Sequence, residues 1–187
     1  ISGVAFSIDV ISDNTMHYQS ILQTLDDYLI EFINRKMKCL DMDANPKEYD
    51  VVRGLAGMGR YLLNRVEANP KVISSLIKIM NHFRDIHYSK SHWIVSRENQ
   101  FLDIDKERFS LGNINLGLAH GILGPFSLLA LSKLKGVEID NHTRLLSDIT
   151  EYLFRTEFQN KLGWLDRYDI AEKYYPTYSV RNGWCYG

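Results

Sequence analysis

The chain of 187 residues is 45% hydrophobic and 12% aromatic, which predicts a globular fold with a substantial core and excludes a disordered chain. Its net charge of −1 disfavours nucleic acid and anionic membrane surfaces as partners, because it offers them no basic field. Two cysteines at unrelated positions, without a secretory leader or a bilayer-spanning apolar run, favour a reducing cytoplasmic compartment. The chain begins with Ile1 and ends on Gly187 inside a motif, so we expect a piece of a longer protein.

Apolar residues at three- and four-residue spacing predict amphipathic helices along the chain. The first helix follows Asp13 or Asn14, either of which can cap it. The second covers about residues 49–66 and ends before Pro70. Pro70 suits the first turn of a third helix. The apolar stripe of this third helix consists of Val72, Ile73, Leu76, Ile77, Met80, Phe83 and Ile86.

Two further helices are predicted in the second half of the chain. One covers about residues 116–135 and ends at Gly136, which suits a left-handed cap. Asp140 opens the other, which carries apolar residues as far as Phe154.

Two stretches break the helical rhythm. Residues 88–114 are predicted to form a polar loop, with a short extended segment at residues 93–95. Residues 163–181 are predicted to form a second loop, rich in aromatic and charged side chains. Loops of this kind often carry the specificity of a site.

A glycine motif recurs along the chain. Gly-Leu-Ala-Gly at residues 54–57 returns as Gly-Leu-Ala-His-Gly at 117–121 and, loosely, as Gly-Trp-Cys-Tyr-Gly at 183–187. The last glycines of the three motifs are about 65 residues apart, a period that holds two helices and favours stacked helical hairpins with an inner and an outer ring. The alternative is that the glycines only permit close packing of helices.

Three side chains with possible chemical roles lie at or near these motifs: Asp50, His120 and Cys185. If the repeats close around one axis, all three point toward a central cavity. An aspartate beside a histidine can orient and charge the imidazole, which then acts as an acid or base near neutral pH. Taken singly, Asp50 could instead be a residue at a helix start, stabilised by the helix dipole, and His120 a structural histidine.

The remaining histidines show no such register, and we expect them in solvent or loops: His17, His82, His87, His92 and His142. Cys39 is interpreted as a core residue of the first helix, because free cysteine is often buried. Cys185 alone cannot hold a metal, since a tetrahedral site needs at least three protein ligands.

Residues 49–57, 115–121 and 181–187 resemble successive signatures of the lanthionine synthetase C-like proteins, especially the bacterial lantibiotic cyclases. The resemblance covers the chain from the second helix onward. It implies an all-α fold, an α/α toroid of two nested helical rings, of which residues 1–187 form an incomplete single domain. The implied activity uses Zn²⁺, which binds a precursor-peptide cysteine as the thiolate. The thiolate then adds to dehydroalanine or dehydrobutyrine and closes a thioether ring.

The resemblance also implies roles for individual residues. His120 matches the proposed acid/base histidine, and Asp50 matches the aspartate of the first signature. Arg181 matches an arginine that stabilises developing negative charge. Cys185 matches the first of three zinc ligands, and the other two are expected beyond residue 187. We therefore expect this piece to be inactive by itself.

The implied partners are a dehydrated lantibiotic precursor peptide and, in a membrane-associated complex, a dehydratase and an ABC exporter. No nucleic-acid partner is expected. The implied location is cytoplasmic, with peripheral association at the inner face of the cell membrane. An incomplete ring exposes apolar helix faces, so we expect self-association or poor solubility when it is made alone.

Two alternatives remain open at this point. The first is a non-catalytic member of the same family that binds peptides or partner enzymes. The second is an α/α-toroid glycoside hydrolase, which would use Asp50 with Asp166 or Asp169 as its pair of carboxylates. The hydrolase leaves the glycine motifs and Cys185 without a role, so the cyclase is the favoured hypothesis.

Overall fold

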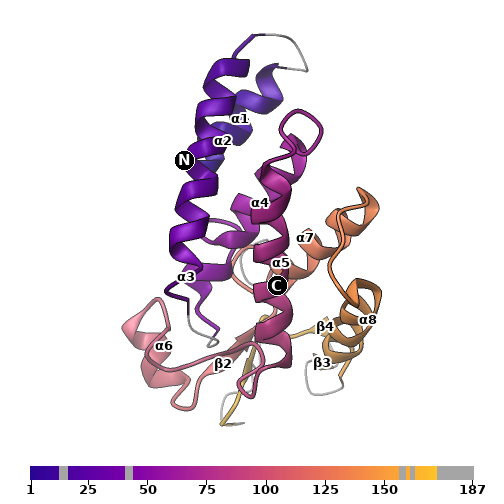
Figure 1. Cartoon of the computed structure of the whole chain (residues 1–187). Coiled ribbons are helices and arrows are strands. Elements are labelled where there is room, and N and C mark those ends of the chain that lie inside the picture. The colour runs from indigo at the N-terminus through magenta and orange to yellow at the C-terminus, as the bar shows by residue number, and fades with distance from the viewer. Residues whose placement is uncertain (13–16, 41–43, 156–158, 161–162, 172–187) are drawn as a thin grey trace.

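The computed structural model describes residues 1–12, 17–40, 44–155, 159–160 and 163–171. Its helices are α1 (Ser2–Ser12), α2 (Gln19–Lys36), α3 (Pro46–Tyr49), α4 (Leu55–Arg65), α5 (Val72–Tyr88), α6 (Asp103–Arg108), α7 (Leu123–Leu134) and α8 (His142–Leu153). Its strands are β1 (Ile94–Val95), β2 (Asn113–Asn115), β3 (Gln159–Asn160), β4 (Gly163–Trp164) and β5 (Arg167–Asp169). The described chain is mainly helical, as predicted (Figure 1).

The helices pack around α4, which contacts α1, α5 and α7. α1 and α2 form a pair at one end of the molecule, whereas α7 packs against α8 at the other (Figure 1). The third predicted helix is confirmed as α5, whose apolar stripe faces the core. The core includes Leu22, Leu29 and Ile33 of α2, Tyr61 and Leu62 of α4, and Leu76, Met80 and Phe83 of α5. Burial of each such side chain stabilises the fold by about 1.5–3 kcal/mol.

A small antiparallel sheet of order β1-β2-β5 joins the two stretches that were expected to be loops. Ile94 pairs with Ile114, which confirms the extended segment expected near residue 94. Asn113 pairs with Asp169 on the other side of β2. The sheet thereby connects residues 94–95 with residues 167–169 and holds β2 in the middle.

The second predicted helix begins later than expected. α4 starts at Leu55, and α3 ends at Tyr49, so residues 50–54 form a turn between two helices. The carboxylate of Asp50 accepts the backbone N–H groups of this turn and replaces the helical hydrogen bonds. Apolar spacing alone does not distinguish such a turn from the first turn of a helix.

The fourth predicted helix also begins later, at Leu123 instead of residue 116. Residues 116–122 form a loop, in which the Asn115 side-chain oxygen accepts the Gly117 N–H at 2.9 Å. The loop closes where the Ile122 N–H donates to the Asn115 carbonyl at 3.0 Å. The predicted end of this helix, α7, is confirmed, because Gly136 follows it in a left-handed conformation with a φ of 72°.

The N-terminal region differs more from expectation. The periodicity does not predict α1, which has no acidic residue in its first turn and no basic residue in its last. α2 begins at Gln19 with Tyr18 at the N-cap, whereas Asp13 and Asn14 lie outside the described residues. The short α6 is a further helix inside a stretch expected to be a loop.

Several single-residue predictions are wrong. Cys39 is exposed beyond the end of α2 instead of buried. His82, His87 and His142 are buried, not in solvent, because each lies on a helix face that packs against the core. Burial disfavours the charged imidazole and lowers the pKa of all three.

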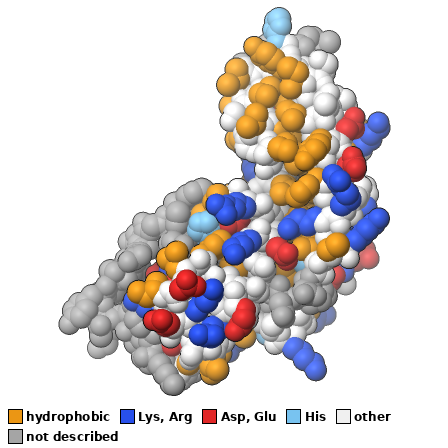
Figure 2. Space-filling view, turned by 90° about the vertical axis from the view of Figure 1, so that its left-hand side faces the viewer, with side chains coloured by type: hydrophobic (Ala, Val, Ile, Leu, Met, Phe, Trp, Pro, Cys, Tyr) orange, Lys and Arg blue, Asp and Glu red, His pale blue; other side chains and the backbone are white. Residues whose placement is uncertain are grey.

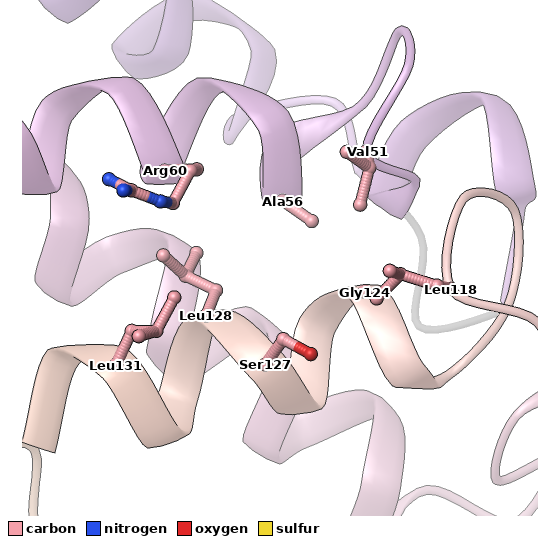
Figure 3. A pocket seen from close by; sticks show the side chains of 8 residues that line it. All are labelled: Val51, Ala56, Arg60, Leu118, Gly124, Ser127, Leu128 and Leu131. Carbon is pink, nitrogen blue, oxygen red and sulfur yellow. The ribbon is translucent and has the colours of Figure 1, made fainter. Parts of the chain in front are cut away.

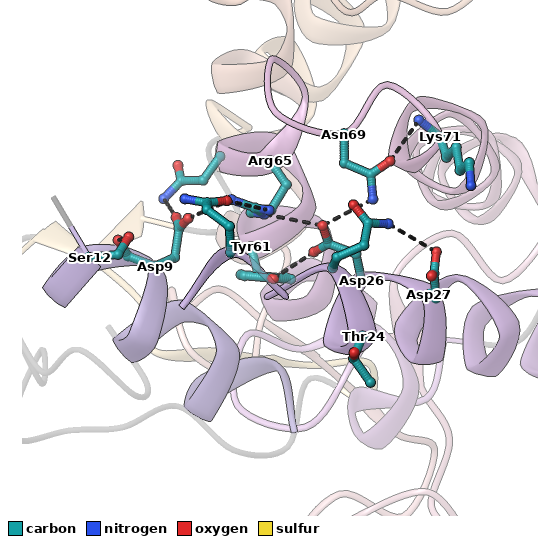
Figure 4. A network of polar contacts seen from close by, with 12 residues as sticks. Asp9, Ser12, Thr24, Asp26, Asp27, Tyr61, Arg65, Asn69 and Lys71 are labelled. Carbon is teal, nitrogen blue, oxygen red and sulfur yellow. Dashed lines mark hydrogen bonds and ion pairs between the residues drawn. The ribbon is translucent and has the colours of Figure 1, made fainter. Parts of the chain in front are cut away.

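A buried polar network links α1, α2 and α4 (Figure 4). Asp26 is fully buried and accepts hydrogen bonds from Tyr61 Oη at 2.6 Å, Asn69 Nδ2 at 3.0 Å and Arg65 Nε at 3.2 Å. Arg65 also reaches Asp9 of α1 at 3.3 Å. Every partner is a side chain from another helix or loop, so the network fixes how these elements pack.

The α1–α2 end of the molecule carries exposed apolar side chains, which Figure 2 shows gathered over its upper part. They include Ile1, Val4, Val10 and Ile11 from or next to α1, and Tyr18, Ile21 and Tyr28 from or next to α2. Self-association of the isolated chain stays a prediction.

Candidate functional site

Asp50 and His120 form a hydrogen-bonded pair, although they lie 70 residues apart in the sequence. Asp50 Oδ2 and His120 Nδ1 are 2.7 Å apart. The Asp50 side chain is fully buried, whereas the His120 side chain keeps 19% of its surface exposed. The pair therefore combines a carboxylate shielded from water with an imidazole that reaches the surface.

The turn after α3 holds the Asp50 carboxylate in place. Asp50 Oδ1 accepts the backbone N–H of Arg53 at 2.6 Å and of Gly54 at 2.8 Å. A Cβ atom at Gly54 would collide with the Asp50 nitrogen and lie 2.6 Å from the Tyr49 carbonyl carbon. Gly54 is therefore required for this close turn. Oδ1 therefore accepts the backbone N–H groups, whereas Oδ2 contacts His120.

Backbone contacts tie the His120 loop to the Asp50 turn. The Val51 N–H donates to the Ala119 carbonyl at 2.9 Å, directly beside both members of the pair. Tyr49 Oη donates to the His120 carbonyl at 3.2 Å. Burial and the Asp50 charge raise the pKa of Tyr49, so its hydroxyl stays protonated and remains a donor. The distance between Asp50 and His120 is thus set by main-chain geometry.

The His120 ring lies against Phe101. The two ring centroids are 5.2 Å apart in an edge-to-face arrangement. Lys47 Nζ lies 5.9 Å from the centroid of the same Phe101 ring. These neighbours restrict the imidazole, which already has its Nδ1 fixed by Asp50. The other ring nitrogen, Nε2, is the one that does not contact Asp50.

Comparisons with known proteins identify the family of this chain. The sequence model of the lanthionine synthetase C-like proteins matches residues 1–187, which is the whole chain. The chain belongs to the lanthionine synthetase C-like family. Its similarity to this family therefore includes α1 and α2, beyond the three motifs that resemble its signatures.

One curated relative is the nisin biosynthesis protein NisC of Lactococcus lactis subsp. lactis, which is 28% identical over all of this chain and 47% of its own length. A solved structure of a nisin cyclase superposes with a TM-score of 0.86 at 26% identity, over 99% of this chain and 48% of the cyclase. This match confirms the α/α toroid as the fold class. The chain spans about half the length of the relatives it matches.

Among the family's expected site residues, the structure brings Asp50 and His120 together. Arg181 and Cys185 lie outside the described residues. The sequence alone does not indicate Phe101, because no motif surrounds it. Tyr49 and Asn115 stand inside the first two signature motifs, and that position is the signal that could have marked them as supports of the site.

The described residues do not complete a metal site. No group of three His, Cys, Asp or Glu side chains within them is placed to hold a metal ion. Cys185, the predicted zinc ligand, lies outside the described residues. None of the described helices is long and apolar enough to cross a bilayer.

The carboxylates of the hydrolase alternative have other partners. Asp166 Oδ1 accepts the Arg167 N–H at 2.9 Å, and Asp169 Oδ1 accepts the Ala171 N–H at 3.0 Å. Asp169 is also buried. Both carboxylates shape the chain around β5, and the family of the chain is that of the lanthionine synthetase C-like proteins, not one of glycoside hydrolases.

Proposed function

We propose that the protein is a lanthipeptide cyclase, which closes thioether rings in a dehydrated precursor peptide. The main observation that supports this proposal is the 2.7 Å contact between Asp50 and His120 in a chain of this family. In the reaction, a cysteine sulfur bonds to the β-carbon of dehydroalanine or dehydrobutyrine, and the carbon–carbon double bond becomes an enolate. A proton added to the α-carbon completes the ring, and the thiol proton is released.

His120 is the acid that protonates the enolate in this proposal. Asp50 holds Nδ1, so that Nε2 faces the peptide, and its charge stabilises the imidazolium that precedes proton transfer. The edge of Phe101 keeps the ring from rotating away. General acid catalysis of this kind contributes about 10²–10⁴-fold in rate.

Zn²⁺ and Arg181 belong to the finer part of the proposal. Bound zinc would supply the peptide thiolate at neutral pH, with Cys185 as one ligand. Arg181 would stabilise negative charge on the enolate oxygen. We expect about one zinc per chain in the full-length protein and its loss in Cys185→Ala, measured by elemental analysis.

The proposal extends to the setting of the reaction. The chain would form part of a single toroid domain that acts on a lantibiotic precursor peptide in the cytoplasm. A dehydratase would supply the dehydrated residues, and an ABC exporter would remove the product at the inner face of the cell membrane. The similarity to NisC, a nisin biosynthesis protein, supports a role in such a pathway.

Ring closure in the full-length protein tests the proposal. Because closure does not change the mass of the peptide, unreacted cysteines are counted by alkylation and mass spectrometry. The unaltered protein should consume thiols of a dehydrated precursor peptide, and His120→Ala should slow this by about 10²–10⁴-fold. His17→Ala, at an exposed histidine, is the matched control and should retain the rate. Equal rates in His120→Ala and the control would contradict the role of His120, and absent closure would contradict the function.

A further inference from the structure

The two sequence neighbours of Asp50 both hold the chain segment that carries His120. The Val51 N–H donates to the Ala119 carbonyl at 2.9 Å. Tyr49 Oη donates to the carbonyl of His120 itself at 3.2 Å. Consecutive carbonyls of one segment are therefore bound by the residues on either side of Asp50. Because Asp50 Oδ2 also contacts the imidazole, this histidine is held at its side chain and at its main chain.

Contacts other than the Tyr49 hydroxyl already join these two segments. Besides the main-chain hydrogen bond from Val51, the side chains of Val51 and Leu118 line one small apolar pocket between α4 and α7 (Figure 3). A Cβ atom at Gly124 would lie 2.8 Å from both the Leu118 carbonyl oxygen and Val51 Cγ2, so the chain is closely packed there. Loss of the Tyr49 hydroxyl would therefore leave the segments joined and would release only the carbonyl of the histidine.

The ring of Tyr49 is itself held by Trp93. Tyr49 is only 1% exposed, and its ring meets the Trp93 ring edge to face, with the centroids 5.6 Å apart. The Trp93 indole N–H in turn donates to His87 Nδ1 of α5 at 3.2 Å. The tyrosine oxygen therefore has a fixed place. Such a support suits a catalytic side chain, which must be held within about 0.5 Å of its working position.

The Tyr49 hydroxyl is not placed to act as an acid in the reaction. Burial and, after it, the charge of Asp50 raise the pKa of Tyr49, so the hydroxyl keeps its proton. It directs that proton to the His120 carbonyl. Because a buried tyrosine hydroxyl needs a hydrogen-bond partner, the bond could serve the stability of the fold alone. A role in the reaction must instead show itself through the histidine.

We propose that Tyr49 is a positioning residue for ring closure, which holds the main chain of His120 so that the imidazole keeps its orientation toward Asp50 and the enolate. This inference rests on the proposed function, since it concerns the same acid. Without the hydroxyl, the peptide unit after His120 gains freedom, and the imidazole spends less time in the productive orientation. Peptide binding is unaffected, because Tyr49 is buried.

Ring closure by the full-length protein tests the proposal. Tyr49→Phe removes the donor but keeps the ring against Trp93, so kcat should fall about tenfold while KM is unchanged. In a His120→Ala background the same substitution should have no further effect, because no imidazole is left to position. The matched control Tyr61→Phe removes a hydroxyl from another buried ring, in the Asp26 network, and should keep kcat and KM although it lowers stability.

A spectroscopic measurement does not depend on turnover. In histidine-labelled full-length protein, the Nδ1–H that faces Asp50 should give a low-field NMR signal, which His120→Ala removes. Tyr49→Phe should broaden this signal, whereas Tyr61→Phe should leave it unchanged. If Tyr49→Phe fails to fold, Trp93→Phe, which keeps the hydroxyl but loosens its ring, should broaden the signal and lower kcat about threefold.

Three results would overturn the positioning role: an unchanged kcat in the folded variant, an unchanged signal, or an equal fall in kcat in the His120→Ala background. If the unaltered protein closes rings and Tyr49→Phe closes them equally fast, only this inference fails. If the unaltered protein closes no rings, the proposed function fails, while the signal still reports whether Tyr49 orients His120.

Discussion

Two buried aspartates in this molecule differ in the partners they hold. Asp26, between α2 and α4, is bound to Arg65, Tyr61 and Asn69, and its charged partner Arg65 is almost fully buried. Asp50 is bound to two backbone N–H groups and to His120. Both carboxylates have no exposed surface.

The difference lies in what the partner can do. Arginine stays protonated in proteins, so the Asp26 network holds helices together without changing its charge. Histidine gains and loses a proton near neutral pH, so the Asp50 pair can take part in a reaction. A buried carboxylate is therefore structural or chemical according to its partner, and the following variants test this distinction.

The largest effect on stability is expected at Asp26. Asp26→Ala leaves the Arg65 guanidinium buried without its main counter-charge, which should lower the free energy of unfolding by about 3–5 kcal/mol. Urea unfolding monitored by circular dichroism measures this loss. Asp27→Ala, at the exposed neighbouring carboxylate of α2, should change it by less than about 0.5 kcal/mol. Similar losses in both variants would contradict a structural role specific to Asp26.

A smaller loss is expected at Tyr61. Tyr61→Phe keeps the ring in the core but removes the donor 2.6 Å from Asp26 Oδ1, while Arg65 and Asn69 remain on Oδ2. One unsatisfied buried oxygen should cost about 2 kcal/mol, measured in the same urea experiment. Tyr28→Phe, at an exposed tyrosine of α2, serves as the control and should be neutral. A neutral Tyr61→Phe would show that Oδ1 finds another donor.

The smallest effect concerns a buried histidine without a bound carboxylate. His87 Nδ1 accepts the Trp93 indole N–H at 3.2 Å, so this hydrogen bond requires an unprotonated Nδ1. Burial and, to a smaller extent, the charge of nearby His92 lower the pKa of His87. The unfolded chain then binds more protons below about pH 6.5, and stability should fall as pH decreases from there. The slope from one histidine is at most about 1.4 kcal/mol per pH unit.

Urea unfolding at a series of pH values measures this dependence. His87→Gln should reduce the slope below pH 6.5, whereas His17→Gln, at an exposed histidine, should leave it unchanged. Equal slopes in both variants would show that burial of His87 does not contribute to acid destabilisation.

The sequence predicts the elements of the site better than it predicts their boundaries. Asp50 and His120 could be paired in advance because each stands next to a recurring glycine motif. Residues 50–54 and 116–122 were assigned to helices because their apolar spacing continues the helical period. Their turns depend on hydrogen bonds to side chains, since Asp50 accepts two backbone N–H groups and Asn115 accepts one. The spacing of apolar residues does not indicate these bonds.

Other features have no local signal in the sequence. Asp26 and Arg65 are 39 residues apart. Both stand in amphipathic helices, in which charged residues usually lie on the solvent-exposed face, so their burial depends on tertiary packing alone. The same holds for His87, which becomes buried because α5 packs on the core. The toroid class, in contrast, was predictable, since family signatures and helical periodicity agree with each other.

The most direct test of the central claim compares Asp50→Asn with Asp26→Asn in the ring-closure assay on the full-length protein. Asparagine at position 50 can still accept the Arg53 and Gly54 N–H groups but offers an amide N–H to His120, so the imidazole loses its charge partner. The account predicts that Asp50→Asn slows closure by about 10²-fold or more with little loss of stability, while folded Asp26→Asn is less stable but keeps its rate. Asp50→Asn closing rings at the unaltered rate would contradict the claim that this aspartate and His120 act as a catalytic pair.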